Sequence, residues 1–173
     1  MNPKKSNIKK FFYAELFNQD CSSSFCSYMK NLKSDDKKLY EKALKLACKI
    51  EPFKNNFDVI ASVPKYDNVF PEETNYSQKT AEIISSKLNI PYEKNIISKI
   101  KYTRKLRTIP GNERFSEIDS AFKINKPLYK RICVVDDVYS SGATMAEIVK
   151  TFNKSGITEI YVAVLVVQSE NKL

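Results

Sequence analysis

The sequence predicts a single α/β domain built on a mainly parallel sheet flanked by helices. Stretches rich in β-branched residues alternate with stretches whose apolar residues recur at helical spacing. Two of the strand-like stretches, RICVVDD and EIYVAVLVV, are almost continuously apolar, as in strands covered on both faces. The chain has 173 residues, 42% of them hydrophobic, which suits one core. We therefore treat 1–173 as one domain.

The first half of the chain contains two predicted strands and two predicted helices. FFYAELF (11–17) has the aromatic, alternating character of an early strand, which we expect at a sheet edge. Apolar residues at helical spacing predict a surface helix over 38–50. FDVIASVP (57–64) predicts a short buried strand. A second helix follows, and its apolar face consists of Tyr76, Thr80, Ile83, Ile84 and Leu88.

The second half continues the alternation after a charged interruption. NIISKI (95–100) predicts the next strand, a loop rich in lysine and arginine then interrupts the sheet, and AFKI (121–124) resumes an extended pattern. RICVVDD (131–137) predicts a buried strand, and EIYVAVLVV (159–167) predicts the last one. The helix between them presents one apolar face made of Met145, Ile148, Val149 and Phe152.

Composition narrows the classes of function. The formal net charge of +9 favours anionic partners, either phosphorylated metabolites or nucleic acid. The absence of histidine excludes Ser-His and Cys-His nucleophilic mechanisms. The spacing of CSSSFC is wider than a zinc C-x-x-C, so we interpret the cysteines as reduced thiols. No apolar run could span a bilayer and MNPKKSNIKK lacks a signal-peptide core, so we expect a cytoplasmic protein without a membrane span.

The stretch CVVDDVYSSGAT (133–144) holds the strongest functional signal. Asp136 and Asp137 follow an apolar run and would lie at the carboxyl end of a parallel strand, where open α/β sheets bind ligands. Two adjacent carboxylates repel each other, and burial increases the penalty. The pair therefore predicts a ligand that satisfies both groups. The alternative is an ordinary Asp-Asp turn followed by a Ser-Gly helix cap.

The residues after the acid pair predict what this ligand is. A turn of small, hydroxylated residues leads into a helix, whose free N–H groups and positive dipole end bind an anion such as phosphate. Gly142 lets the backbone come close to that anion. Carboxylates repel phosphate, so Asp136 and Asp137 must face neutral donors on the same ligand, and sugar hydroxyls fit best. The ligand predicted is a ribose 5-phosphate unit.

These residues resemble a known family. CVVDDVYSSGAT closely resembles the phosphoribosyl pyrophosphate (PRPP) motif of type I phosphoribosyltransferases, and the ComF-like branch is the nearest match. SVPK and NYSQ resemble the V-P loop and the G-F-N-Q of the family, so the likeness covers 57–167. The segment 1–36 is variable, and the N-terminal zinc ribbon of many ComF proteins is missing from it. A basic stretch, KIKYTRKLRTIPGNERFSEIDSAF, is in register with the branch pattern at Lys99, Lys101, Thr103, Arg114, Ala121 and Phe122.

The resemblance implies a set of site residues. The PRPP-binding residues would be Asp136, Asp137, Tyr139, Ser140, Ser141, Gly142, Ala143 and Thr144, and the pyrophosphate loop would be Val63, Pro64 and Lys65. Magnesium would be carried by PRPP near the acid pair, without direct protein ligands of its own. The basic stretch 99–114 would close as a lid hinged near Pro110 and Gly111, and its catalytic cations would be Lys101, Arg104 and Lys105. The sequence leaves the oligomeric state open, with a homodimer as one candidate.

Two functions of different class remain open. Retention of the basic lid favours a phosphoribosyltransferase that moves the 5-phosphoribosyl group from PRPP to an unknown acceptor and releases pyrophosphate. Leu106 and Glu117 stand where the family has Gln and Asn, which is a departure from its hydrogen-bonding pattern. Lys65 is the only cation between Pro64 and Gln78, and this depleted pyrophosphate loop favours a ComF-like accessory protein for single-stranded DNA uptake in transformation. Such DNA would meet Lys99, Lys101, Arg104, Lys105, Arg107 and Arg114, with Tyr66, Phe70, Tyr76 and Tyr102 as stacking candidates.

Overall fold

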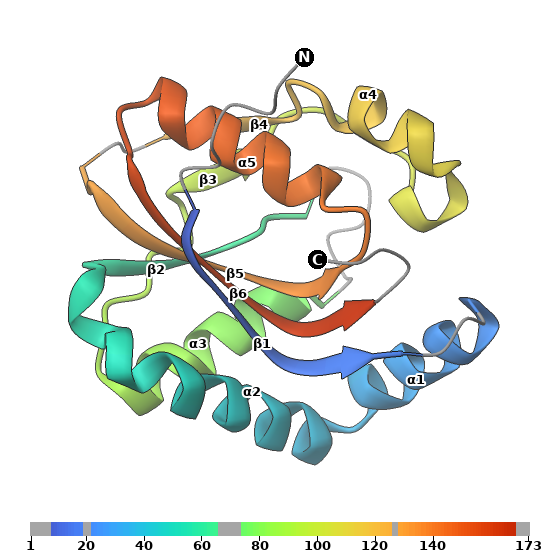
Figure 1. Cartoon of the computed structure of the whole chain (residues 1–173), viewed down its shortest axis with the longest axis horizontal. Coiled ribbons are helices and arrows are strands. Elements are labelled where there is room, and N and C mark those ends of the chain that lie inside the picture. The colour runs from blue at the N-terminus through green and yellow to red at the C-terminus, as the bar shows by residue number, and fades with distance from the viewer. Residues whose placement is uncertain (1–7, 19–21, 66–73, 126–127, 169–173) are drawn as a thin grey trace.

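Parallel strands form the central sheet of the protein. The computed structural model describes residues 8–18, 22–65, 74–125 and 128–168. In the main sheet the strands run in the order β1 (Ile8–Phe17), β6 (Glu159–Gln168), β5 (Arg131–Tyr139) and β2 (Val59–Ser62), all parallel. The predicted parallel α/β domain is therefore confirmed, with β1 at an edge and β5 inside the sheet (Figure 1).

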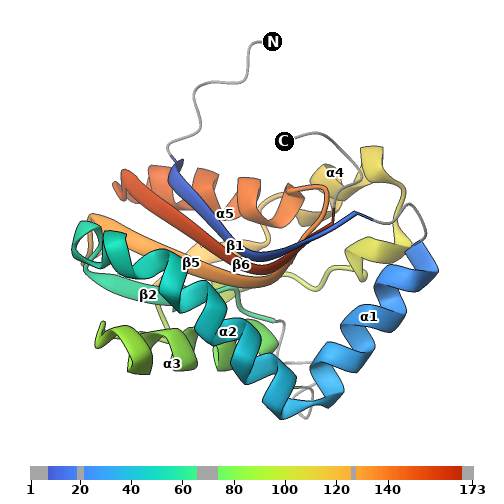
Figure 2. The ribbon, with the colours of Figure 1, turned by 60° about the horizontal axis from the view of Figure 1, so that its bottom comes forward.

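Helices cover both faces of this sheet. Helices α2 (Asp36–Ile50) and α3 (Tyr76–Leu88) lie on one face and α5 (Ala143–Lys154) on the other, as Figures 1 and 2 show. On β5, Cys133 and Val135 belong to the core under α2 and α3, whereas Ile132 and Val134 belong to the core under α5. Both faces of the strand are buried, which explains its continuous apolar run.

Local signals in the sequence set the ends of the helices. The Asp35 side chain accepts a hydrogen bond from the backbone N–H of Lys38 at the start of α2, and Asn75 accepts one from Gln78 at the start of α3. Gly156, with a φ of +80°, follows the end of α5, a position where glycine commonly ends a helix. The apolar face predicted for α2 is buried throughout, at Leu39, Ala43, Leu46, Ala47 and Ile50.

The two short strands in the middle of the chain form within the predicted segments but do not belong to the main sheet. Strands β3 (Ile97–Lys99) and β4 (Phe122–Ile124) pair antiparallel in a ribbon of their own and do not join the parallel sheet. Ile97 and Phe122 pack into the core under α5, so this ribbon lies on the sheet face instead of extending its edge. The connection between them contains η2 (Leu106–Thr108), η3 (Gly111–Glu113) and α4 (Arg114–Ile118).

Helix α1 (Ser22–Ser34) was not predicted from the sequence. Its buried residues, Phe25, Met29 and Leu32, follow helical spacing, but polar residues surround them and hide the pattern. The helix lies beyond the carboxyl ends of the strands, between β1 and α2 (Figure 2). The short 3₁₀ turn η1 (Glu51–Asn56) links α2 to β2. Within the described ranges, no helix has the length and apolar character needed to cross a membrane.

Candidate functional site

A cavity of about 920 Å³ opens at the carboxyl ends of β2, β5 and β6. It brings together the acid pair, the loop before α5, the residues after β2 and the basic segment between β3 and β4, four regions that lie apart in the sequence. Helix α1 forms a further wall. The residues of the basic segment on the cavity wall are Lys99, Tyr102, Thr103, Arg104, Lys105, Leu106, Thr108 and Arg114.

Asp136 is buried at this end of β5, with 8% of its surface exposed. The Ser77 hydroxyl, on the first turn of α3, donates to Asp136 Oδ1 at 2.9 Å, and the backbone N–H of Asp137 donates to the same oxygen at 2.9 Å. Burial and then the negative charge of Asp137 raise the pKa of Asp136 well above its ordinary value, against the effect of the Ser77 bond. The surroundings of Asp136 thus favour the neutral form of this carboxyl group more than water does.

Asp137 is more accessible and is paired. Its Oδ2 forms an ion pair with Nζ of Lys33 from α1, and the two side chains are 22% and 31% exposed. The same ammonium lies 5.0 Å from the centre of the Tyr76 ring, a cation–π contact. A residue of the variable N-terminal segment therefore reaches the acid pair, which the sequence did not predict.

The loop before α5 has a backbone conformation that requires glycine at position 142. Gly142 is the N-cap of α5 and has a φ of +76°, in the left-handed region that favours glycine. A Cβ at this position would lie 2.5 Å from Oη of Tyr139, whose ring also packs on Phe11 with the centroids 4.9 Å apart. Ser140 and Thr144 line the cavity. The first turn of α5 thus faces the same space as the acid pair.

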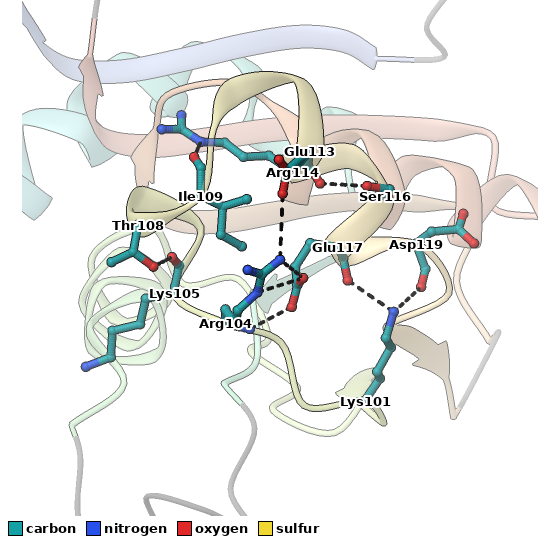
Figure 3. A network of polar contacts seen from close by, with 10 residues as sticks. All are labelled: Lys101, Arg104, Lys105, Thr108, Ile109, Glu113, Arg114, Ser116, Glu117 and Asp119. Carbon is teal, nitrogen blue, oxygen red and sulfur yellow. Dashed lines mark hydrogen bonds and ion pairs between the residues drawn. The ribbon is translucent and has the colours of Figure 1, made fainter.

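The basic segment is folded by its own polar contacts, which Figure 3 shows. Glu117 accepts from the backbone N–H of Arg104 at 2.8 Å and from its Nε and Nη2 at 3.2 and 2.9 Å. These bonds lower the pKa of Glu117, the one from the Arg104 backbone most of all. Lys101 Nζ donates to the carbonyl oxygens of Glu117 and Asp119. In Figure 3 the side chain of Lys105 points away from this network.

Positive charge dominates the wall of the cavity. Among the described lining residues, six are cationic and two, Asp136 and Asp137, are acidic. Lys99 donates to Thr103 Oγ1 at 2.6 Å, and burial lowers its pKa, partly offset by the charge of Glu117. The cationic residues are Lys33, Lys65, Lys99, Arg104, Lys105 and Arg114. An anionic ligand with a donor-rich, neutral part fits this distribution of charge.

The structure separates the predicted site residues into two groups. Those that line the cavity are Val63, Pro64, Lys65, Arg104, Lys105, Asp136, Asp137, Ser140 and Thr144. Lys101, Tyr139, Ser141, Gly142 and Ala143 lie outside this lining. Tyr66, Phe70 and the side chain of Arg107 lie outside the described part of the chain.

Some lining residues were missed from the sequence. They include four residues of α1, namely Phe25, Cys26, Met29 and Lys33. Helical spacing of Phe25, Met29 and Leu32 was the only signal that could have located this helix. Ser77 donates a hydrogen bond to Asp136, but in the sequence nothing distinguishes it from any polar residue in the first turn of a helix.

The donor set limits how a metal ion could bind here. Within the described residues, no three His, Cys, Asp or Glu side chains come together as a metal site. Asp136 and Asp137 offer carboxyl oxygens only, and Mg²⁺ is commonly bound through one or two carboxylates plus the phosphates of a substrate. The site therefore fits Mg²⁺ that arrives on a phosphorylated ligand, as the sequence analysis expects.

Comparisons with known proteins agree with this arrangement. No protein-family model matches the chain. A structure of the allosteric regulatory enzyme of purine biosynthesis is similar over 63% of this chain and 22% of that one, with 23% identity and a TM-score of 0.42. The crystal structure of a purine phosphoribosyltransferase from Pyrococcus horikoshii is similar over 77% of this chain and 74% of that one, with 22% identity and a TM-score of 0.50. The chain has the type I phosphoribosyltransferase fold.

A curated relative of this phosphoribosyltransferase-fold protein is Competence protein F from Haemophilus influenzae. The two are 33% identical over 92 residues, which make up 51% of this chain and 40% of that protein. The chain thus matches less than half of the length of this relative. The predicted likeness to ComF proteins agrees with this match.

Proposed function

We propose that the cavity binds PRPP through its ribose 5-phosphate unit. The observation that carries the proposal is the acid pair, with Asp136 buried, beside the start of α5 in a cavity whose charged lining residues are mostly cations. Asp136 and Asp137 would accept hydrogen bonds from the ribose hydroxyls, and the loop 140–144 would donate to the 5-phosphate. The phosphoribosyltransferase fold supports this choice of ligand, because the segment 133–144 resembles the PRPP motif of that superfamily.

The charges of the site decide the orientation of the ligand. In the reverse orientation the phosphate would face the two carboxyl groups in a partly buried pocket, where repulsion is strong. In the proposed orientation each charged group meets donors, and charge-assisted hydrogen bonds contribute about 1.5 to 3 kcal/mol each. The raised pKa of Asp136 also favours its uncharged form, which would lower the repulsion that the approaching ligand meets. The residues Val63, Pro64 and Lys65 would then lie beside the group on C1 of the ribose.

The reaction that we propose is transfer of the 5-phosphoribosyl group with release of pyrophosphate. The bond at C1 breaks as positive charge develops on the sugar, so the protein must position the ribose and stabilise the leaving charge. Mg²⁺ carried by the pyrophosphate would neutralise part of that charge. Arg104 and Lys105 both line the cavity, but the Arg104 guanidinium is paired with Glu117 and would have to leave it to meet pyrophosphate.

Removal of one acceptor of the acid pair tests the binding proposal. We expect Asp137→Ala to weaken binding of ribose 5-phosphate at least about tenfold, equivalent to about 1.4 kcal/mol, because the sugar hydroxyls lose a charged acceptor. Calorimetric titration measures the affinity, and circular dichroism confirms the fold. Asp58→Asn is the matched control, since Asp58 pairs with Arg131 just before β2, away from the cavity. A wild-type protein without affinity at millimolar ligand would refute the proposal.

Transferase activity needs a separate experiment. Pyrophosphate release from Mg²⁺–PRPP would be screened against nucleobases, glutamine and ammonia, because the sequence leaves the acceptor unknown. We expect release above background with one acceptor, and loss of that release in Asp137→Ala. Tight binding of PRPP without release by any of these acceptors would instead favour the accessory role.

Single-stranded DNA is a second candidate ligand, favoured by exposed aromatic residues on the basic segment. Tyr102 and Phe115 are each 52% exposed, although large aromatic side chains are usually buried. They flank Arg104 and Lys105 in the sequence, and aromatic side chains beside cations are typical of surfaces that bind single strands. This candidate is the ComF-like role in DNA uptake for transformation.

The salt dependence of DNA binding tests this candidate. Because the proposed contacts are between cations and phosphates, we expect the affinity for a single-stranded oligonucleotide to fall at least about tenfold between about 50 and 200 mM salt. Fluorescence anisotropy measures it, and a variant with Lys105 and Arg104 changed to glutamine should show a shallower slope. An affinity that ignores salt, or is the same in the variant, would count against DNA binding along this segment.

A further inference from the structure

The pyrophosphate loop of this chain and the residues after it carry little positive charge. Lys65 is the only cation of the sequence between Pro64 and Gln78. A diphosphate on C1 of a ribose would carry several negative charges into this region, and the single lysine of this loop offers little to balance them. Cations from other parts of the cavity wall must then contribute if such a ligand binds.

Lys33 lies where that cation is needed. Its ammonium group lies between Asp137 on β5 and the ring of Tyr76, the first residue of α3. The next residue, Ser77, donates to Asp136, so Lys33 faces the gap between the acid pair and the start of α3. Helix α3 is the element that follows the pyrophosphate loop in the chain. Buried Leu32 anchors this end of α1 in the core.

The N-terminal end of α3 adds to the attraction for an anion at this point. Asn75 caps the helix by accepting from Gln78 N–H, and its side-chain amide also donates to the carbonyl oxygen of Val63. The cap thereby ties the start of α3 to the residues after β2. The first turn of a helix carries partial positive charge. Lys33 and this turn together form a positive region beside Asp137.

We propose that Lys33 recognises the diphosphate on C1 of the ribose and so makes the site selective for PRPP over ribose 5-phosphate. This inference rests on the function proposed above. When ribose hydroxyls bind Asp137 they replace Lys33 as its partner. A partly buried ammonium then needs a new anion, because an unpaired charge is costly in such a place. PRPP supplies that anion and ribose 5-phosphate does not.

This exchange of partners gives the Lys33–Asp137 ion pair a role in the ligand-free protein. Lys33 holds Asp137 in position before the ligand arrives. When PRPP binds, this ion pair is replaced by contacts between Asp137 and the ribose hydroxyls and by contacts between Lys33 and the diphosphate. A ligand that can make only the sugar contacts must break the ion pair without replacing it. Lys33 therefore acts as a specificity-determining residue, and the discrimination comes from the charge of its ammonium and not from its length.

The test compares two probes, PRPP and ribose 5-phosphate, on the full chain. Lys33→Met removes the charge and keeps an unbranched side chain of similar length. We expect its affinity for PRPP to fall at least about tenfold, whereas its affinity for ribose 5-phosphate changes by less than about threefold or rises. Lys33→Arg should keep most of the preference for PRPP. Lys30→Met is the control, because Lys30 is exposed on the same helix and lies outside the cavity lining.

The outcomes separate this inference from the proposed function. Equal losses for both probes in Lys33→Met would mean that the ion pair only supports the fold of α1, and would overturn the inference alone. Unchanged binding of PRPP would do the same. A wild-type protein that binds neither probe would overturn the proposed function, and the inference with it. Thermal unfolding of each ligand-free variant shows whether α1 is still docked.

Discussion

Gly142→Val should weaken binding of ribose 5-phosphate at least about 100-fold, equivalent to about 2.7 kcal/mol. Two effects act together. The φ of +76° is strongly unfavourable for a β-branched residue. The new Cβ would also lie 2.5 Å from Tyr139 Oη and 2.9 Å from its Cζ, so either the ring or the loop must move. Any such movement displaces the N–H groups that we expect to hold the 5-phosphate.

Two other glycines provide matched controls for this variant. Gly156 has a φ of +80°, and a Cβ there would meet nothing within 4 Å, so Gly156→Val carries the backbone strain without the clash. Gly111 has neither the positive φ nor a close neighbour. We expect Gly156→Val to lower the melting temperature while keeping the affinity, and Gly111→Val to change little. If calorimetric titration found Gly142→Val still binding like the wild type, the loop would not be the phosphate site.

Asp136→Asn should stabilise the ligand-free protein. Burial and the charge of Asp137 raise the pKa of Asp136 in the folded state, so ionisation of this group opposes folding. An asparagine cannot ionise, and its Oδ1 can accept from the Ser77 hydroxyl and from the Asp137 N–H as the carboxyl oxygen does. We expect the free energy of unfolding of Asp136→Asn to exceed that of the wild type at pH 7.

The effect of Asp136→Asn on the free energy of unfolding should depend on pH. Asp136 favours the folded wild-type protein most below the ordinary pKa of an aspartate. This contribution falls as the pH rises from there to the raised pKa of the folded state. The advantage of Asp136→Asn should therefore be small near pH 4 and grow toward neutral pH. Urea unfolding at several pH values measures it, with Asp58→Asn as the exposed control. If the difference in free energy of unfolding between wild type and Asp136→Asn were constant across this range, folding would not raise the pKa of Asp136.

The sequence predicts those parts of the fold that depend on local patterns. The helix over 38–50 and the strands around Val59, Val134 and Val164 were found because periodicity reports directly on burial. The acid pair was placed correctly at the carboxyl end of an interior parallel strand, because an apolar run that ends in two carboxyl groups is typical of a strand that reaches a ligand crevice. The likeness to a family then identified the other segments that meet in the cavity.

The parts that could not be predicted depend on contacts between distant segments. The period of β3 and β4 is the same in a parallel sheet and in a separate antiparallel ribbon, so only packing decides between them. Nothing local to Arg104 indicates that Glu117 will hold its guanidinium, because a loop brings the two together. Lys33 is one of many lysines in the sequence, and only the docking of α1 brings it to Asp137.

The pairing of β1 with β6 has a consequence for how the protein is made. Residues of β1, such as Phe12 and Ala14, are buried only when β6 is beside them, with Phe12 opposite Ala163. During synthesis on the ribosome β1 appears early, and its partner strand emerges about 150 residues later. Until then an aromatic, strand-forming segment lacks its neighbouring strand, which leaves its backbone groups open to wrong pairing. Lys9 and Lys10, at the start of β1, place positive charge beside this unpaired strand, and such charge opposes aggregation.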